Sequence, residues 1–291
     1  MRSSRSMISV LLAVPLMIGC GSSSDSEARE GTAHDGASAG SATRDAHSIA
    51  VSNSYLAAAI RDLLGEKADL LVLAEPGMCP GHFDLRPSQM RQMRSCGLLV
   101  RFDFQQSLDS RLGDTDDPPR VVPVRVPGGM CEPDSYESVC RQVADALVEK
   151  GLLSREAADQ RLSAISRRMS QLADWMESRV EAAGLRDATT LSSGHQAAFC
   201  RGLGLNVVAT FSGADAATPG QIEEALKAGK QSGVRFVVAN LPEGRQLADA
   251  LADRFQAKAV VFGNFPDGES GSAFDELVRG NVNTLVQTTT P

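Results

Sequence analysis

A run of thirty residues without glycine or proline, Ser154 to Ala183, constrains the fold more than any other feature. At 1.5 Å per residue it predicts one helix about 45 Å long. Ordinary helices have three or four turns, so this one is long enough to run along two folded lobes. Its apolar residues do not keep a sustained heptad, which argues against a coiled coil.

Strand and helix patterns alternate on both sides of this run. The strands read as continuous apolar segments, among them "DLLVLA", "GLLVRF", "NVVATF", "RFVVAN" and "KAVVF". Such segments are typical of parallel sheets that are covered on both faces. The pattern predicts an α/β protein with two parallel-sheet lobes, residues 48–153 and 185–291, joined by one long interlobe helix at 154–184.

The N-terminus indicates export. Arg2 and Arg5 precede an apolar run from Met7 to Ile18, and Gly19 and Cys20 are followed by a polar stretch. A basic start and a short apolar segment predict a signal peptide, residues 1–19, since a membrane span needs roughly 20 apolar residues. The segment "LMIGC" resembles the lipobox of bacterial lipoproteins, which implies cleavage before Cys20 and its lipidation. The alternative is an ordinary signal peptide with an incidental cysteine.

Composition excludes several classes of function. Residues 20–47 hold almost no large apolar side chain and predict a flexible tether. The net charge of −7, with no basic block, argues against a nucleic-acid partner. We find no phosphate-binding glycine loop, nucleophile elbow or Cys-x-x-Cys pair, and therefore expect no enzyme and no catalytic residues. Cys96, Cys140 and Cys200 are expected in the core, and Trp175 in interlobe packing.

Two similar turns, "GMCPGH" at 77–82 and "GGMCEP" at 128–133, follow predicted strands of the first lobe. His195 follows the strand "TTLSS" of the second lobe. The carboxyl ends of parallel strands are where ligands bind in such folds. These three segments therefore predict one binding site.

The order of elements resembles the zinc/manganese solute-binding lipoproteins of ABC importers, in which a rigid helix joins the lobes. Four segments carry the resemblance, which runs from Ile49 to the C-terminus: "VSNSYLAAAIRDLLGEKADLLVL", "GMCPGHFDLRPSQMRQMRSCGLLV", "GVRFVVANLPEGRQLADALADRFQAKAVVF" and "LVRGNVNTLVQ". It implies a metal ion held by imidazoles and carboxylates from two loops of each lobe. It also implies a monomer that is anchored to the membrane by lipid, faces the periplasm or the exterior, and partners an ABC permease.

The family's ligand pattern is not kept. Its first two histidines fall on Gly81 and Gly128, and its last carboxylate on Gly263. The same loops instead carry Cys79, His82, Cys131 and His195, with Asp84, Asn264 and Asp267 as outside candidates for a fourth ligand. Two thiolates and two imidazoles suit Zn²⁺ and are tolerable for copper(I).

These observations predict an extracytoplasmic solute-binding lipoprotein that captures a transition-metal ion, with zinc favoured, for an ABC importer. The first alternative is a metal-free binding module of the same fold, in which Cys79 and Cys131 form a disulfide, as an oxidising compartment favours. The second is an extracytoplasmic metallochaperone without a transporter.

Overall fold

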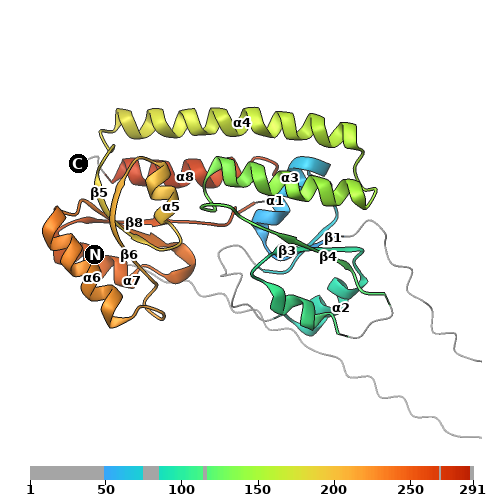
Figure 1. Ribbon diagram of the computed structural model, residues 1–291, viewed down its shortest axis with the longest axis horizontal. Coiled ribbons are helices and arrows are strands. Elements are labelled where there is room, and N and C mark those ends of the chain that lie inside the picture. Colours follow the sequence, from blue (N-terminus) through green and yellow to red (C-terminus); the bar gives the residue numbers. More distant parts are fainter. Residues whose placement is uncertain (1–48, 75–84, 114–116, 269, 289–291) are drawn as a thin grey trace, which may run out of the picture. The chain divides into compact units, whose positions relative to one another are not determined.

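The protein is described here from a computed structural model, in residues 49–74, 85–113, 117–268 and 270–288 (Figure 1). All of them belong to one compact unit, Ala42–Pro291. They form two four-stranded parallel sheets, with strand orders β2-β1-β3-β4 and β6-β5-β7-β8. We call them sheet A and sheet B. The strands are β1 (Ile49–Val51), β2 (Leu70–Val72), β3 (Leu98–Phe102), β4 (Arg120–Val124), β5 (Thr189–Ser193), β6 (Asn206–Phe211), β7 (Phe236–Asn240) and β8 (Lys258–Phe262).

Helices cover both faces of each sheet, which confirms the predicted fold class. They are α1 (Ser54–Leu64), α2 (Pro87–Ser95), α3 (Pro133–Glu149), α4 (Arg155–Ala182), α5 (Ala197–Gly202), α6 (Pro219–Ser232), α7 (Gln246–Phe255) and α8 (Ala273–Gln287), with 3₁₀ turns η1 (Gln106–Arg111) and η2 (Leu241–Glu243). In the described part of the chain, no helix combines the length and the apolar character that a membrane span requires.

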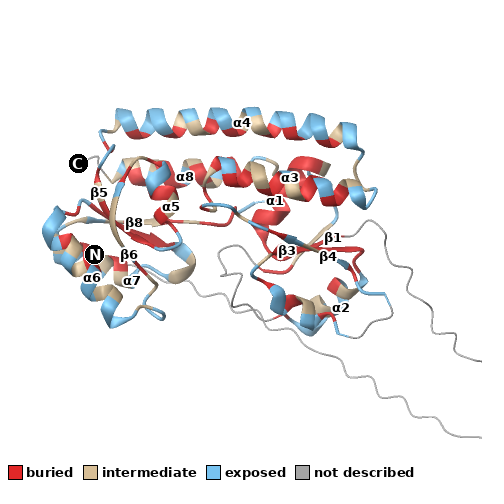
Figure 2. Cartoon of the chain, viewed as in Figure 1, coloured by how far each residue is buried: buried red, intermediate tan, exposed pale blue. Residues whose placement is uncertain are grey.

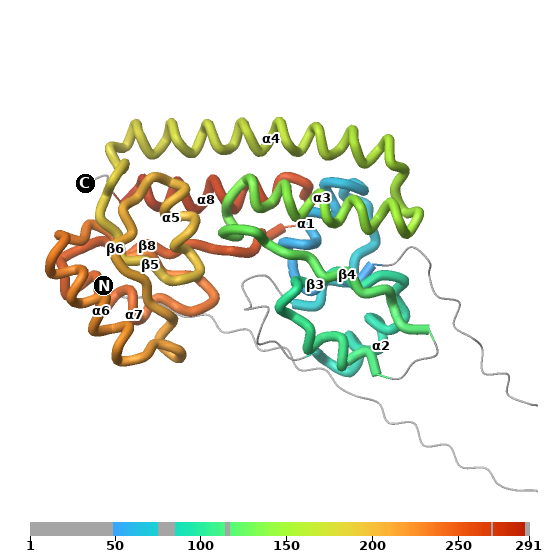
Figure 3. Tube along the Cα trace, in the orientation of Figure 1, coloured from blue at the N-terminus to red at the C-terminus, as the bar shows by residue number. Residues whose placement is uncertain are grey.

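Helix α4 is the long helix that the sequence predicts. The Ser154 side chain caps it by accepting a hydrogen bond from the Ala157 amide, which satisfies one of the free N–H groups of the first turn. One face is buried along its length, from Ala158 to Val180, and the other is exposed (Figure 2). The chain leaves sheet A through α3, follows α4, and enters sheet B at β5 (Figure 3).

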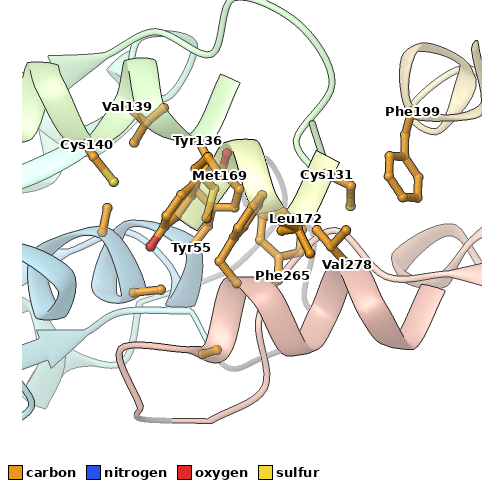
Figure 4. Close-up of a cluster of buried hydrophobic side chains, with 14 of the residues drawn as sticks. Tyr55, Cys131, Tyr136, Val139, Cys140, Met169, Leu172, Phe199, Phe265 and Val278 are labelled. Carbon is orange, nitrogen blue, oxygen red and sulfur yellow. The ribbon is translucent and has the colours of Figure 1, made fainter. Parts of the chain in front are cut away.

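One hydrophobic core is shared by both sheets. Buried side chains of α1, α3, α4, α5 and α8 form a single cluster with those of strands from sheet A and sheet B. At its centre Tyr136 of α3 stacks on Phe274 of α8, with ring centroids 3.9 Å apart, and Tyr55 of α1 meets both rings edge-on. Figure 4 shows this region. Separate clusters lie under α2 and under α6 and α7.

A charged network at the edge of this core joins α1, α4 and α8. The guanidinium of Arg168 donates to the Asp62 carboxylate, with an Nη1–Oδ1 distance of 2.8 Å, and its Nε lies 3.0 Å from Asp275 Oδ1. Tyr136 donates from its hydroxyl to Asp62 Oδ2 at 2.7 Å. Because the Asp62 side chain is only 4% exposed, its charge depends on these partners rather than on water.

Replacing Arg168 by alanine is therefore expected to lower the free energy of unfolding by about 3 kcal/mol, since it leaves Asp62 as a buried unpaired charge. This is the lower end of the usual range, because the Arg168 side chain is 30% exposed and water can enter its place. Arg141→Ala is the matched control: Arg141 also lies in a helix and pairs with a carboxylate, Glu137, but is 60% exposed. Its loss should cost less than about 1 kcal/mol. Urea denaturation measures the free energy of unfolding of both variants. Equal losses of stability would contradict the claim that Asp62 depends on Arg168.

Candidate functional site

A cleft of about 510 Å³ lies at the carboxyl ends of both sheets. The segments after β3, β4, β5, β7 and β8 all contribute to its lining. The lining residues are Phe104, Val126, Gly128, Gly129, Met130, Gly194, His195, Ala198, Asn240, Pro242, Glu243, Asn264 and Phe265. The loops that follow parallel strands therefore meet here, as expected for a ligand site in such sheets.

His195 enters the cleft from the segment between β5 and α5. Helix α5 begins at Ala197, so His195 precedes the helix. Its side chain is 65% exposed, and its Nε2 atom lies 3.8 Å from Glu243 Oε1. The imidazole is thus accessible and close to a carboxylate.

Glu243 is held at the end of η2 by two hydrogen bonds. The Ser193 hydroxyl donates to Oε2 at 2.5 Å, and the Gly213 amide donates to Oε1 at 3.1 Å. Zinc–nitrogen and zinc–oxygen bonds are about 2.1 Å long, so one ion can contact two atoms up to about 4.2 Å apart. The separation of 3.8 Å between His195 and Glu243 allows a single ion to bind both.

Three amide side chains are hydrogen-bonded to one another near this pair. Gln196 is fully buried, and its Nε2 donates to Oδ1 of Asn240 at 3.1 Å and to Oδ1 of Asn264 at 2.8 Å. The side-chain oxygens of both asparagines therefore accept from Gln196. Asn240 and Asn264 also line the cleft.

Comparison with known proteins identifies the family. The model of the periplasmic component A of the zinc-uptake complex, ZnuA, matches residues 49–288. The chain belongs to this family. Its members are periplasmic metal-binding, solute-binding proteins rather than enzymes. No curated protein sequence matches the chain.

Solved structures of other proteins share the ZnuA-type fold. A manganese-bound periplasmic metal-binding protein from Candidatus Liberibacter asiaticus is 12% identical, with a TM-score of 0.70, over 84% of this chain and 99% of that one. The solute-binding protein FpvC of Pseudomonas aeruginosa, in complex with Mn²⁺, is 15% identical, with a TM-score of 0.68, over 83% and 97%. A crystal structure of ZnuA is 14% identical, with a TM-score of 0.66, over 82% and 99%.

Gly128 and Gly263, where the resemblance places a histidine and a carboxylate of the family, are closely packed. A Cβ atom at Gly128 would collide with the carboxylate of Glu132, which is anchored by the Gly129 amide. A Cβ atom at Gly263 would lie 3.0 Å from Leu277 Cδ1, tighter than ordinary packing allows. A side chain at either place would therefore require Glu132 or Leu277 to move.

Cys131 lies beneath the cleft rather than in its lining. It is a free thiol with no exposed surface; its Sγ donates to the Gly263 carbonyl at 3.1 Å and accepts from Asn281 Nδ2 at 3.4 Å. Burial raises the pKa of this thiol far above its usual range. In this state Cys131 links the loop after β4 to sheet B as a neutral hydrogen-bonding group, and a metal would have to displace these contacts to bind it.

The other residues singled out in the sequence lie outside the described ranges, on the surface or in the core. Cys20, Cys79, His82 and Asp84 lie outside the described residues, so their roles as lipidation site and ligands stay predictions. Asp267 is exposed and does not line the cleft. Cys96, Cys140 and Cys200 are buried, as predicted, and burial raises the pKa of Cys200 to about 12. Trp175 packs against the shared core, with the Arg279 guanidinium 4.4 Å from its ring centroid.

Sequence reasoning missed Glu243. It follows β7 in "ANLPEG", at the same kind of strand end as His195, so the rule that selected His195 could also have found it. Among the described residues, histidine, cysteine, aspartate and glutamate form no group of three or more that could hold a metal ion. The described residues place His195 beside Glu243, whereas Cys131 does not line the cleft.

The state of Cys131 can be tested by labelling the native protein with iodoacetamide and mapping modified peptides by mass spectrometry. We expect Cys131 to stay unmodified in buffer and to react in urea without reductant, because only unfolding exposes it. Cys140 is equally buried and serves as the internal reference. Rapid labelling of native Cys131 would contradict the packing, and labelling in urea only after reduction would show the alternative disulfide.

Proposed function

We propose that this protein is a lipid-anchored, extracytoplasmic solute-binding protein that captures a transition-metal ion in the cleft and delivers it to an ABC permease. The proximity of His195 and Glu243 at the meeting point of the strand ends carries the proposal. An imidazole and a carboxylate are the donor types from which metal sites of this kind are built. Family membership supports the same conclusion.

The donor set favours zinc. Imidazole suits Zn²⁺ and other late transition metals, whereas manganese prefers oxygen ligands. The further ligands proposed from the sequence are Cys79 and His82, and a thiolate from Cys79 would strengthen the preference for zinc. Cys131 is a ligand in this proposal only if its bonds to Gly263 and Asn281 are exchanged for the metal.

Delivery to a permease is proposed from the architecture and the N-terminus. Membrane attachment through Cys20 keeps the protein beside a transporter, and residues 21–47 allow it to reach the transporter surface. Metal release would need only a small shift of the loops around the cleft, since His195 and Glu243 come from different segments of sheet B.

Zinc affinity of the purified mature protein tests the first part of the proposal. We expect stoichiometric Zn²⁺ binding by titration calorimetry and elemental analysis. His195→Ala should raise the dissociation constant at least about 100-fold, because it removes a ligand. Glu243→Gln should raise it about 10- to 100-fold, the usual effect of losing a carboxylate that binds or orients in a metal site.

Glu177→Gln is the control for the charge change. Glu177 lies on α4, is 66% exposed and pairs with Arg186, so its substitution should leave zinc affinity within about twofold. Wild-type protein that binds no transition metal would refute metal capture. Unchanged affinity in both cleft variants would place the metal elsewhere.

A further inference from the structure

We infer that Ser193 sets the metal preference of the cleft, by holding the carboxylate of Glu243 so that it binds an ion through one oxygen only. Ser193 is a positioning residue in this inference and does not itself touch the metal. The inference rests on the proposed function, because it assumes that His195 and Glu243 bind a transition metal. It goes beyond that function by assigning the choice between zinc and manganese to a residue outside the ligand set.

The ends of three neighbouring strands bring Ser193 into contact with Glu243. In sheet B, β5 lies between β6 and β7. Ser193 is the last residue of β5, while Gly213 follows β6 and Glu243 follows β7. The Glu243 carboxylate accepts one hydrogen bond from the Ser193 hydroxyl and another from the Gly213 amide. It is therefore held by groups from two other strand ends.

The Ser193 hydroxyl is itself fixed in place. Ser193 is only 1% exposed, and its oxygen accepts a hydrogen bond from the backbone amide of His195 at 3.3 Å. Because the oxygen serves as the acceptor for this amide, the hydroxyl proton is directed to the carboxylate of Glu243. The hydroxyl thus links the segment that carries the imidazole to the carboxylate beside it.

The two carboxylate oxygens of Glu243 have different roles in this arrangement. Oε1 is the oxygen that lies 3.8 Å from His195 Nε2, whereas Oε2 accepts from Ser193. A metal bound by both oxygens competes with the Ser193 hydroxyl for Oε2, and losing a buried hydrogen bond is costly. A metal bound through Oε1 alone leaves that hydrogen bond in place. The contacts therefore favour monodentate binding by Glu243.

Monodentate binding affects zinc and manganese differently. Zinc sites in proteins are usually four-coordinate and tetrahedral, whereas manganese prefers octahedral shells that are rich in oxygen. A second carboxylate oxygen helps to fill an octahedral shell but crowds a tetrahedral one. By keeping Oε2 from the metal, Ser193 favours zinc over manganese.

Ser193→Ala in the full mature protein tests the inference. Titration calorimetry should show a zinc dissociation constant about 10- to 100-fold higher, the usual effect of removing a group that orients a metal ligand. The manganese concentration that displaces half of the bound zinc should fall at least about threefold, because manganese gains access to the second oxygen as zinc loses affinity. Ser193→Thr keeps the hydroxyl and should bind zinc within about threefold of wild type.

Ser192→Ala is the matched control. Ser192 precedes Ser193 on β5 and is also buried, but its hydroxyl donates to the Ser193 carbonyl at 2.9 Å and is not bonded to Glu243. Its substitution removes a buried hydroxyl from the same strand without freeing the carboxylate. Zinc affinity and manganese competition should both stay within about threefold of wild type, since the outer shell of the site is intact.

A double-mutant cycle shows whether Ser193 acts through Glu243. In a Glu243→Gln background, Ser193→Ala should weaken zinc binding by less than about threefold, because the group that it positions is already changed. The inference is overturned if Ser193→Ala binds zinc like wild type, if manganese competes no better against it, or if its effect is undiminished in the Glu243→Gln background. Metal capture survives each of these results; wild-type protein that binds no metal overturns both the proposed function and the inference.

Discussion

Arg168 forms ion pairs with helices that belong to both sheets. One guanidinium on α4 contacts Asp62 of α1 and Asp275 of α8, and so connects helices that cover different sheets. Burial raises the pKa of Asp275, so its ionised form depends on this cation. Beside the network, the ring of Tyr136 stacks on Phe274 and meets Tyr55 edge-on within the shared core. The ion pairs and the shared hydrophobic core together connect the two sheets.

Hydrogen bonds beneath the cleft hold the loops that line it in place. The Cys131 thiol donates a hydrogen bond to the Gly263 carbonyl. The side chain of Asn281 accepts from the Gly263 amide and donates to the Gly263 carbonyl. These contacts join the loop after β4 to the loop after β8, directly below the lining. A cleft whose two walls are connected in this way has preorganised donors, which reduces the free-energy cost of binding.

Much of the fold was predictable, because long uninterrupted patterns determine it. The absence of glycine and proline and the cap at Ser154 indicate α4, and continuous apolar runs indicate the buried parallel strands. The site was harder to predict. His195 and Glu243 are 48 residues apart and meet only through the packing of the β5 and β7 ends. Whether Cys131 faces a cleft or a carbonyl depends on the path of a single turn, which residue types alone do not specify.

The location of a bound metal tests the central claim most directly. Crystals of the mature protein grown with zinc, measured at the zinc absorption edge, would give an anomalous difference map with one dominant peak. The account predicts this peak about 2.1 Å from both an imidazole nitrogen of His195 and a carboxylate oxygen of Glu243. A peak away from both residues, for example one coordinated by the Cys131 sulfur beneath the cleft, would contradict it.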